Sequence, residues 1–240
     1  MITKVRLADI AIEITHIHSE LQDFLKDYMI PDDTCELFIN CTEDDIQKER
    51  DFSEEEGFSS PYLETLAVLR KIAEIFPSHE RILMHGASIS YEGKGYLFTA
   101  PSGTGKTTHI RLWREYLGNK IDIINGDKPF ISLENEPRIY GSPWAGKENW
   151  HKNHSFPLSG ICFIERGTEN RIRKMEPSEF LPLLFNQLYL PSDPLAVALT
   201  LELADKLLKK VPIWLLQCDI SEDAVKCSFE MITNKKWMCR

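Results

Sequence analysis

The sequence lacks any C-x-x-C pair and any other cysteine spacing that is typical of a metal site. It also lacks a charged-then-apolar leader and any apolar run long enough to span a bilayer, so we expect a cytoplasmic protein without membrane contact. Several cysteines have apolar neighbours, which favours reduced thiols in a protein core over a disulfide framework. The six cysteines are Cys35, Cys41, Cys162, Cys218, Cys227 and Cys239.

Positive charge is also scarce. The chain has 28 Lys and Arg against 37 Asp and Glu, and its net charge is −9. A field of this sign repels nucleic acid and anionic membranes, although a local basic pocket remains compatible with it. We find no internal repeat and no low-complexity tract, and 240 residues suit one domain with a smaller appendage.

Residues 1–57 are predicted to form a small α+β lobe. Apolar residues alternate over residues 5–14 with a slip in phase at Ala8-Asp9, which indicates two strands joined by a turn. Helical spacing follows over residues 21–29, and alternation returns over 35–41. The charged stretch from Thr42 to Gly57 has little periodicity, so we expect a solvated loop and a domain boundary there.

Residues 58–240 are predicted to form the main domain, which begins with a helix that has Ser60 as its cap and Pro61 at its first position. Two apolar runs flank Glu92-Gly93-Lys94-Gly95, which favours a hairpin whose first strand carries His85. An antiparallel neighbour makes the expected sheet mixed. Further strands are expected over 120–125, 129–134, 160–167 and 211–218, and helices over 195–208 and 221–232.

The hairpin leads into the phosphate-loop pattern G-x-x-x-x-G-K-[ST], with Ala100 at the first glycine position. Gly103 and Gly105 allow the backbone amides to turn toward a phosphate, Lys106 can reach the β and γ oxygens, and Thr107 can offer its hydroxyl to Mg²⁺. The motif lies between a predicted strand and a predicted helix, as a phosphate loop requires. We therefore expect a nucleotide to bind at Ser102, Gly103, Thr104, Gly105, Lys106, Thr107 and Thr108.

Two further side chains are candidates for chemistry beside this loop. Asp127 follows the strand that ends at Asn125, where a carboxylate can hold Mg²⁺ or accept a proton from an attacking hydroxyl. His85 is expected on the strand that flanks the loop. Taken alone, Asp127 is compatible with a turn cap and His85 with a core histidine. Their joint placement around the loop favours the functional interpretation.

The segment SGTGKTT (Ser102–Thr108) is similar to the phosphate loop of the ATP-dependent phosphoenolpyruvate carboxykinases. The stretch from about Arg81 to Glu230 resembles the catalytic domain of HPr kinase/phosphorylase and its smaller relatives. This resemblance rests on MHGASISYEGKGYLFTAPSGTGKT, the strand ending in Gly126-Asp127, a glycine turn near Gly141, and VPIWLLQCDISEDAV. It implies an α/β fold with a mixed β-sheet P-loop domain of this type and a small amino-terminal lobe, which is unlike the regulatory domain of the HPr enzyme.

The resemblance also implies roles for individual residues. Asp127 matches the family's general base and His85 the histidine near it, while Lys106 matches the phosphate lysine. Thr107 matches the Mg²⁺ hydroxyl ligand, and Asp127 is the second candidate for the metal. ATP and Mg²⁺ are the implied cofactors. Some relatives phosphorylate serine on proteins, on precursor peptides or as the free amino acid, and relatives are often homo-oligomers.

The sequence departs from the family pattern at two places. Asp127-Lys128 stands where two consecutive aspartates are common, so either Asp127 has a single duty or an acid such as Glu148 or Glu165 compensates. YGSPWAGKENWHKN replaces the family's glycine- and arginine-containing signature. In that segment the lysines at 147 and 152 either steady the phosphoryl group or are solvated, and the tryptophans at 144 and 150 either pack or cover the substrate.

The sequence thus predicts an ATP-dependent kinase that phosphorylates a hydroxyl, with serine of a peptide, protein or small molecule as the expected acceptor. The alternative is a nucleotide-binding partner or switch in a peptide-maturation or regulatory complex without phosphoryl transfer, which Lys128 favours. A carboxykinase acting on a dicarboxylic acid is a weaker alternative, because neither the chain length nor a matching His and Lys metal set supports it. ATP, GTP and pyrophosphate all remain open as donors.

Overall fold

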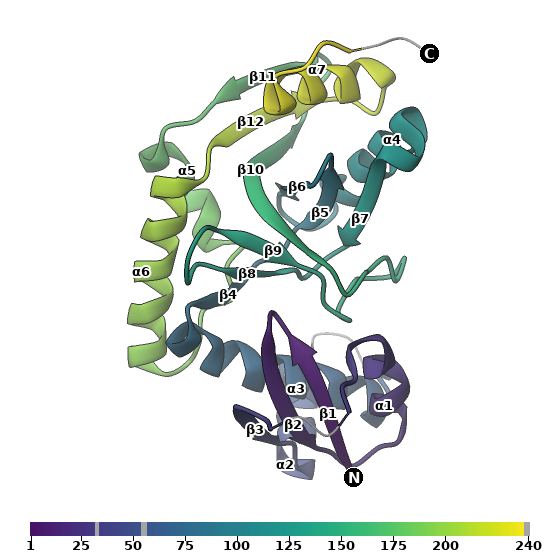
Figure 1. The fold of residues 1–240 in the computed structure, drawn as a ribbon, viewed down its shortest axis with the longest axis vertical. Coiled ribbons are helices and arrows are strands. Elements are labelled where there is room, and N and C mark those ends of the chain that lie inside the picture. The colour runs from purple at the N-terminus through teal and green to yellow at the C-terminus, as the bar shows by residue number, and fades with distance from the viewer. Residues whose placement is uncertain (32–33, 54–56, 238–240) are drawn as a thin grey trace.

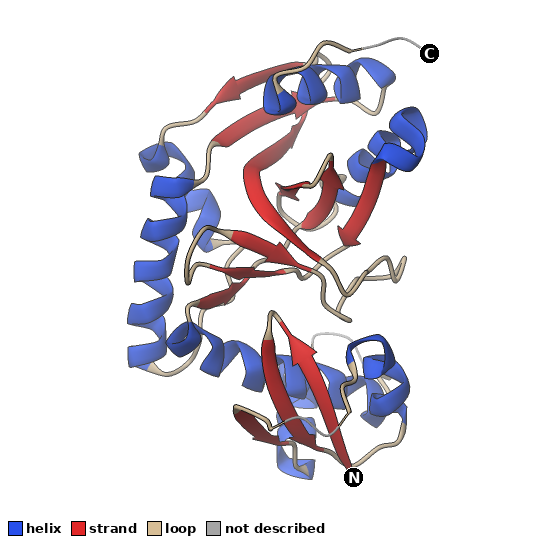
Figure 2. Ribbon diagram, in the orientation of Figure 1, coloured by secondary structure: helices blue, strands red, loops and turns tan. Residues whose placement is uncertain are grey.

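The structure, a computed structural model, describes residues 1–31, 34–53 and 57–237. In these residues seven α-helices surround a three-stranded sheet and a nine-stranded sheet (Figures 1 and 2). The large sheet contains both parallel and antiparallel pairs. The prediction of a mixed α/β fold is therefore confirmed.

The small sheet contains the amino-terminal strands that the alternating pattern predicted. Strands β1 (Ile2–Leu7) and β2 (Ile10–Thr15) are antiparallel, and β3 (Leu37–Asn40) lies parallel to β2. Ala8 and Asp9 form the turn between β1 and β2 with φ values of 48° and 68°. Both residues lie in the left-handed region that such a tight hairpin turn requires. Helix α1 (Glu20–Leu25) follows and continues as a short 3-10 helix over residues 26–28.

Helix α2 (Glu43–Phe52) shows that the expected solvated loop from Thr42 to Gly57 is wrong over its first part. Thr42 and Asp45 form a reciprocal capping box, in which the Asp45 carboxylate accepts from the Thr42 backbone amide at 2.9 Å. Ile46 and Glu49 form a buried stripe that packs against the next helix. The high density of charged residues therefore led to the prediction of a loop where the chain forms a short amphipathic helix. Residues 54–56 of the expected loop lie outside the described residues.

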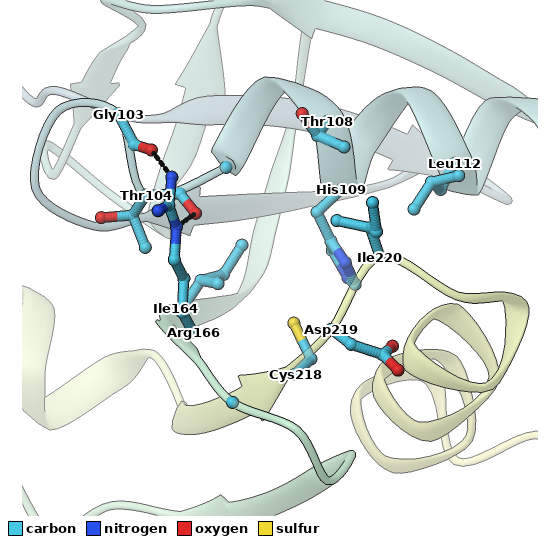
Figure 3. Close-up of a pocket in the computed structure, with 12 residues that line it drawn as sticks. Gly103, Thr104, Thr108, His109, Leu112, Ile164, Arg166, Cys218, Asp219 and Ile220 are labelled. Atoms are coloured by element: carbon cyan, nitrogen blue, oxygen red, sulfur yellow. Dashed lines mark hydrogen bonds between the residues drawn. The ribbon is translucent and has the colours of Figure 1, made fainter.

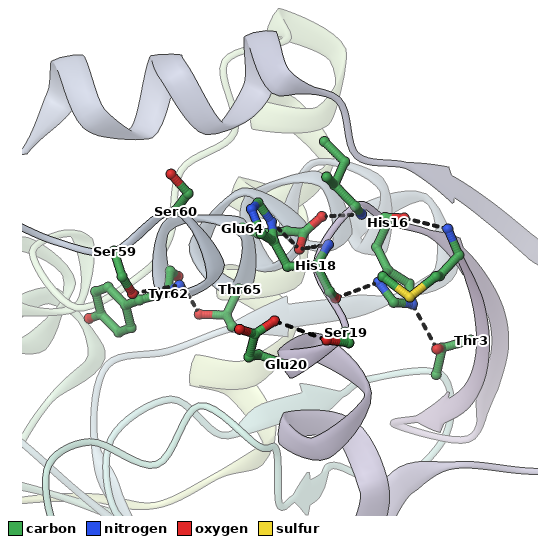
Figure 4. A network of polar contacts seen from close by, with 12 residues as sticks. Thr3, His16, His18, Ser19, Glu20, Ser59, Ser60, Tyr62, Glu64 and Thr65 are labelled. Carbon is green, nitrogen blue, oxygen red and sulfur yellow. Dashed lines mark hydrogen bonds and ion pairs between the residues drawn. The ribbon is translucent and has the colours of Figure 1, made fainter.

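Helix α3 (Ser60–Ile75) begins one residue earlier than expected, with Ser59 as its N-cap. Its apolar face shares a core with the small sheet. The fully buried Glu64 accepts hydrogen bonds from the backbone amides of Ile17 (2.6 Å) and His18 (3.0 Å), which ties α3 to the segment after β2 (Figure 4). Helix α3 thus packs with the amino-terminal strands, and the boundary between residues 57 and 58 stays a prediction.

The large sheet has the strand order β4-β8-β9-β10-β6-β5-β7, with β12 beside β10 and β11 beside β12. The long strand β10 is parallel to β6 and β12 and antiparallel to β9, so it runs through both halves of the sheet (Figure 1). The strands are β4 (Arg81–Leu83), β5 (Ala87–Tyr91), β6 (Lys94–Thr99), β7 (Ile121–Asn125), β8 (Phe130–Ser132), β9 (Arg138–Tyr140), β10 (Ser155–Arg166), β11 (Arg171–Lys174) and β12 (Ile213–Cys218).

The predicted hairpin is confirmed as β5 and β6, joined at Glu92 and Gly93 with φ values of 47° and 76°. His85, however, lies between β4 and β5 and not on a strand of the hairpin. Its backbone amide donates to the Gln187 carbonyl at 2.7 Å, and the amide of Gly86 donates to the Asp127 carbonyl at 2.8 Å. These bonds to other segments replace strand pairing at this point.

Helices cover both faces of the large sheet (Figure 2). Consecutive residues of β6 point to opposite faces, so that Leu97 joins a core with α6 while Phe98 joins a core with α4 and α7. Gly118, with a φ of 61°, ends α4 as predicted. The four helices are α4 (Lys106–Leu117), α5 (Pro177–Phe185), α6 (Pro194–Lys210) and α7 (Glu222–Thr233).

The prediction of buried thiols is confirmed for Cys41, Cys162 and Cys218. Burial raises the pKa of Cys41 and of Cys218 to about 12, and it raises the pKa of Cys162 well above its usual value. Cys239 lies outside the described residues. Of the helices in the described part of the chain, none combines the length and apolar character that crossing a bilayer requires.

Candidate functional site

A glycine loop (residues 100–105) connects the carboxyl end of β6 to the first turn of α4. Gly103 and Gly105 have φ values of 75° and 123°, a region that other residues rarely adopt. A Cβ atom at either position would meet no other atom within 4 Å. The glycines are therefore required by the backbone conformation, while the space in front of them stays open.

Lys106 begins α4 and is only 6% exposed. Its ammonium group donates to the carbonyl oxygens of Ala100 (2.9 Å) and Pro101 (3.3 Å), and neither acceptor carries a charge. Burial lowers the pKa of Lys106, and the nearby Asp127 carboxylate opposes this effect. A buried cation whose hydrogen-bond acceptors are neutral carbonyls favours the arrival of an anion. The loop and its lysine thus fit a phosphate group.

Arg166, the last residue of β10, holds the glycine loop from one side. Its guanidinium donates to the carbonyl of Gly103 (2.5 Å) and to that of Thr104 (3.1 Å), as Figure 3 shows. In a trans peptide the amide points away from the carbonyl, so the N–H of Gly105 faces away from Arg166. Sequence reasoning missed Arg166, because the contact depends on β10 lying beside β6 and no local motif marks it.

A cavity of about 430 Å³ adjoins the glycine loop (Figure 3). It lies between the first two turns of α4 and the turn that follows β12, and its volume falls in the range of small-molecule sites. Helix α4 contributes Thr108, His109 and Leu112 to its lining. Cys218 comes from the end of β12, and Asp219 and Ile220 come from the turn that follows.

Asp127 lies in the turn after β7, where both of its carboxylate oxygens have partners. Oδ1 lies 3.1 Å from Nε2 of His85, and Oδ2 accepts from Nζ of Lys128 at 2.5 Å. Burial alone raises the pKa of Asp127, but the hydrogen bond from His85 and the charge of Lys128 outweigh it and hold the pKa well below its usual range. Asp127 is therefore ionised at neutral pH.

His85 links this carboxylate to the glycine loop. The hydroxyl of Thr99, the last residue of β6, donates to the His85 carbonyl at 2.7 Å. The His85 side chain in turn contacts Asp127. The structure thus brings together the end of β6, His85 and Asp127, three parts of the chain that are separated in the sequence.

Asn125, which is fully buried, shapes the turn that carries Asp127. Its Oδ1 accepts from the backbone amides of Asp127 (2.8 Å) and Lys128 (2.6 Å). Its Nδ2 donates to the carbonyl (2.8 Å) and to the hydroxyl (3.0 Å) of Ser142. A side chain that closes a turn in this way is typical of asparagine. The sequence signal was a polar residue that ends an apolar strand just before Gly126.

Trp144 is a core residue that also lines the cavity beside Asp127. It is 5% exposed, and its indole N–H donates to the Thr65 carbonyl of α3 at 2.9 Å. Phe24 of α1 contacts its ring edge-on, with the ring centroids 5.6 Å apart. Trp150 is half-buried and packs on the core near α4 and α7. Trp144 therefore joins the small sheet's helices to the segment beside Asp127.

The remaining charged candidates are spread over the surface. Lys152 pairs with Asp122 at an exposed site, whereas Lys147 lines a cavity that also contains Asp127. Glu165 lines an open cavity of about 520 Å³ together with the glycine loop. Glu148 is exposed in the turn that follows Lys147. Glu165 is thus the predicted substitute acid that lies beside the loop.

Thr107 is half-buried in the first turn of α4, directly after Lys106. The described residues contain no group of three or more His, Cys, Asp or Glu side chains that could hold a metal ion. Mg²⁺ commonly binds through one or two protein oxygens, substrate phosphates and water. The hydroxyl of Thr107 and the carboxylate of Asp127 are oxygen donors of that kind, and His85 and Lys128 already contact the two oxygens of Asp127.

No family model matches the sequence, and no curated protein matches it. Among solved structures, the chain is similar to the Hpr(Ser) kinase/phosphatase from Coxiella burnetii, with a TM-score of 0.36 and 8% sequence identity. The similarity covers 63% of this chain and 93% of that chain. A likeness at this level does not define a family, so the function proposed below depends on the residues of the site.

Proposed function

We propose that the chain is a kinase that transfers a phosphoryl group from ATP·Mg²⁺ to a hydroxyl, with serine as the expected acceptor. One observation carries this proposal: Lys106 is a buried cation that donates to two neutral carbonyls, at the start of a helix whose preceding loop requires two glycines. The ionised Asp127 is linked through His85 to Thr99, the residue just before this loop. This combination suits phosphoryl transfer, which needs positioning and charge stabilisation more than covalent chemistry.

The residues of the site divide into three roles. The loop amides from Ser102 to Thr108, with the ammonium of Lys106, bind the phosphates. The Thr107 hydroxyl and the Asp127 carboxylate would hold Mg²⁺, which stabilises charge on the phosphates when it is bound. The Asp127 carboxylate also accepts the proton of the acceptor hydroxyl, and His85 orients that carboxylate through its 3.1 Å contact. Because the pKa of Asp127 is low, we expect it to take the proton late, as the phosphoryl group leaves its donor.

A second candidate function has a specific observation in its favour. Lys128 pairs with Asp127 at 2.5 Å and so occupies one oxygen of the only carboxylate proposed as the base. If this pair persists with nucleotide bound, the chain binds ATP as a switch or partner protein and transfers nothing. The two functions differ in whether phosphate moves to an acceptor.

The test uses γ-labelled ATP with Mg²⁺ and serine-containing peptides, proteins and free serine. We expect Asp127→Asn to lower transfer at least about 100-fold, as loss of a general base does, while the affinity for ATP measured without Mg²⁺ is unchanged. Lys106→Ala is expected to weaken ATP binding about 10- to 100-fold, because it removes a charge-assisted contact. Asp44→Asn, an exposed acid on α2, is the matched control.

Two outcomes would contradict parts of this proposal. If Asp127→Asn retains transfer, the assignment of the base is wrong. If ATP binds with an affinity that depends on Lys106 but no acceptor is labelled, the switch function replaces the kinase.

A further inference from the structure

The cavity that Asp127 and Lys147 line has a volume of about 360 Å³ and lies between two amino-terminal helices and the larger part of the chain. Helices α1 and α3 provide one wall, through residues that include Phe24, Tyr62 and Leu66. The opposite wall consists of Asp127, Lys128 and part of the segment 143–149. The amino-terminal elements therefore complete a cavity that opens onto the proposed base.

We propose that this cavity is the acceptor site, and that it accepts a serine within a peptide that also carries an apolar neighbour and a carboxylate. The inference rests on the kinase function proposed above and deepens it by naming the substrate class. Its basis is the chemistry of the lining. The lining combines a carboxylate that can accept a proton from a hydroxyl, an apolar wall, and a net positive charge of its side chains.

The apolar wall is larger than free serine can use. Tyr62 is 45% exposed although it is a large side chain, and its ring packs on Phe58 with the centroids 5.1 Å apart. Phe24 and Leu66 are half-buried next to it. The only side-chain carbon of free serine carries the hydroxyl, so this surface would gain nothing from it, whereas a leucine or phenylalanine beside the serine would bury apolar area. The volume is at the small end of the range for ligand sites, which suits a few residues of an extended peptide.

The lining has a net positive charge, which favours binding of an anionic group. It contains one carboxylate, that of Asp127, and the two ammonium groups of Lys128 and Lys147. Lys128 already pairs with Asp127. The ammonium of Lys147, which is exposed, therefore leaves the cavity with a net positive charge although the whole chain has a net charge of −9. An acidic side chain or a terminal carboxylate of the peptide complements this charge.

The cavity is preformed, because its two walls are anchored to each other. Trp144 fixes the segment 143–149 to α3 through its hydrogen bond to the Thr65 carbonyl. Gly146 has a φ of 77°, and a Cβ there would lie 3.2 Å from the Cβ of Asp127. The segment thus wraps closely around the Asp127 side chain. A preformed wall reduces the ordering cost of binding a flexible peptide.

The probe is a library of synthetic decapeptides with a central serine, in which one neighbouring position at a time is fixed. Label from γ-labelled ATP is measured by mass spectrometry, with free serine as a parallel acceptor. For the wild-type chain we expect enrichment of large apolar residues and of Asp or Glu near the serine. A second library, with alanine in place of the serine, measures retention on the immobilised protein independently of transfer.

Two variants separate the features of the lining. Tyr62→Ala is expected to lower labelling of the apolar peptides about tenfold, the size expected for part of a buried aromatic contact. Lys147→Gln is expected to reduce the preference for acidic residues about threefold, in keeping with an exposed ion pair. Phe38→Ala and Lys48→Gln are matched controls, because both residues are exposed on the amino-terminal elements outside the cavity.

The outcomes distinguish this inference from the kinase function. Labelling that is the same in Tyr62→Ala, or that favours free serine, overturns the peptide site and leaves the kinase standing. Retention of the alanine peptides that depends on Tyr62, without any labelling, supports the site and rejects the kinase. If neither labelling nor retention depends on Tyr62, the peptide site is rejected.

Discussion

Replacing Asn125 with alanine tests how the turn that carries Asp127 is built. The change removes four hydrogen bonds: two that Oδ1 accepts from the amides of Asp127 and Lys128, and two that Nδ2 donates to Ser142. A buried hydrogen bond contributes about 1 kcal/mol net, and bonds made by one side chain are not independent. We therefore expect the free energy of unfolding to fall by about 2–4 kcal/mol, a large part of the stability of a typical domain.

Urea unfolding of wild type and Asn125→Ala, followed by circular dichroism, measures this difference. Asn153→Ala is the matched control, because that exposed asparagine makes one hydrogen bond, to the Asp27 carbonyl. Its expected effect is within about 1 kcal/mol. If Asn125→Ala lost no more stability than this control, the turn would be held by other contacts and our account of the Asp127 position would be refuted. Loss of ATP-dependent labelling should accompany the loss of stability.

Two further predictions concern Gly146 and His109. Gly146→Ala is expected to cost about 1–2 kcal/mol of unfolding free energy, since its φ is 77°, and to lower labelling without changing ATP affinity by crowding Asp127. Gly93→Ala is its control, because Gly93 has a φ of 76° and a Cβ atom there would contact nothing within 4 Å. Equal labelling in the two variants would contradict the expectation that a methyl group at position 146 displaces Asp127. Burial lowers the pKa of His109 from 6.5 to about 3, so below pH 6.5 the unfolded chain binds a proton that the folded chain excludes. The free energy of unfolding of the wild type, measured by urea titration, should therefore fall by about 1.4 kcal/mol per pH unit below 6.5 relative to that of His109→Gln. If the two proteins lost stability in parallel as the pH fell, His109 would not titrate in this way.

The elements that sequence analysis predicted are those with strong local signals. The hairpin of β5 and β6 has a glycine turn between two apolar runs, and α4 follows a glycine loop and ends at Gly118. Helix α2 was missed because its buried stripe is only Ile46 and Glu49, and because its charges are partnered across space, as Glu49 is by Arg70 at 3.0 Å. Strands β9 and β11 have three and four residues, too few to show an alternating pattern, and β11 pairs with β12, which lies far along the chain.

The candidate site divides in the same way. Lys106 and the loop glycines were predictable from a contiguous motif, and Asp127 from its place after an apolar strand. The contacts that organise the site were not predictable, because they join segments far apart in the chain. Arg166 reaches the loop across 62 residues of sequence, and Trp144 reaches α3 across 79. Only the packing of β10 beside β6, and of α3 beside the segment 143–149, creates these contacts.

The apolar core around α3 has a consequence for how the protein comes apart. It includes Leu21 and Ile72 of the amino-terminal elements and also Phe130 and Trp144 from the larger part of the chain. Two other cores lie wholly in the larger part, but separating the parts would expose this shared core to water, so we expect heat to disrupt both parts in one cooperative step. A chain cleaved between the two parts would expose the apolar residues of this core if the parts separated, and such a surface promotes aggregation. A destabilising substitution in β1 or β2 would then also disturb the structure beside Asp127, although Asp127 is far away in the sequence.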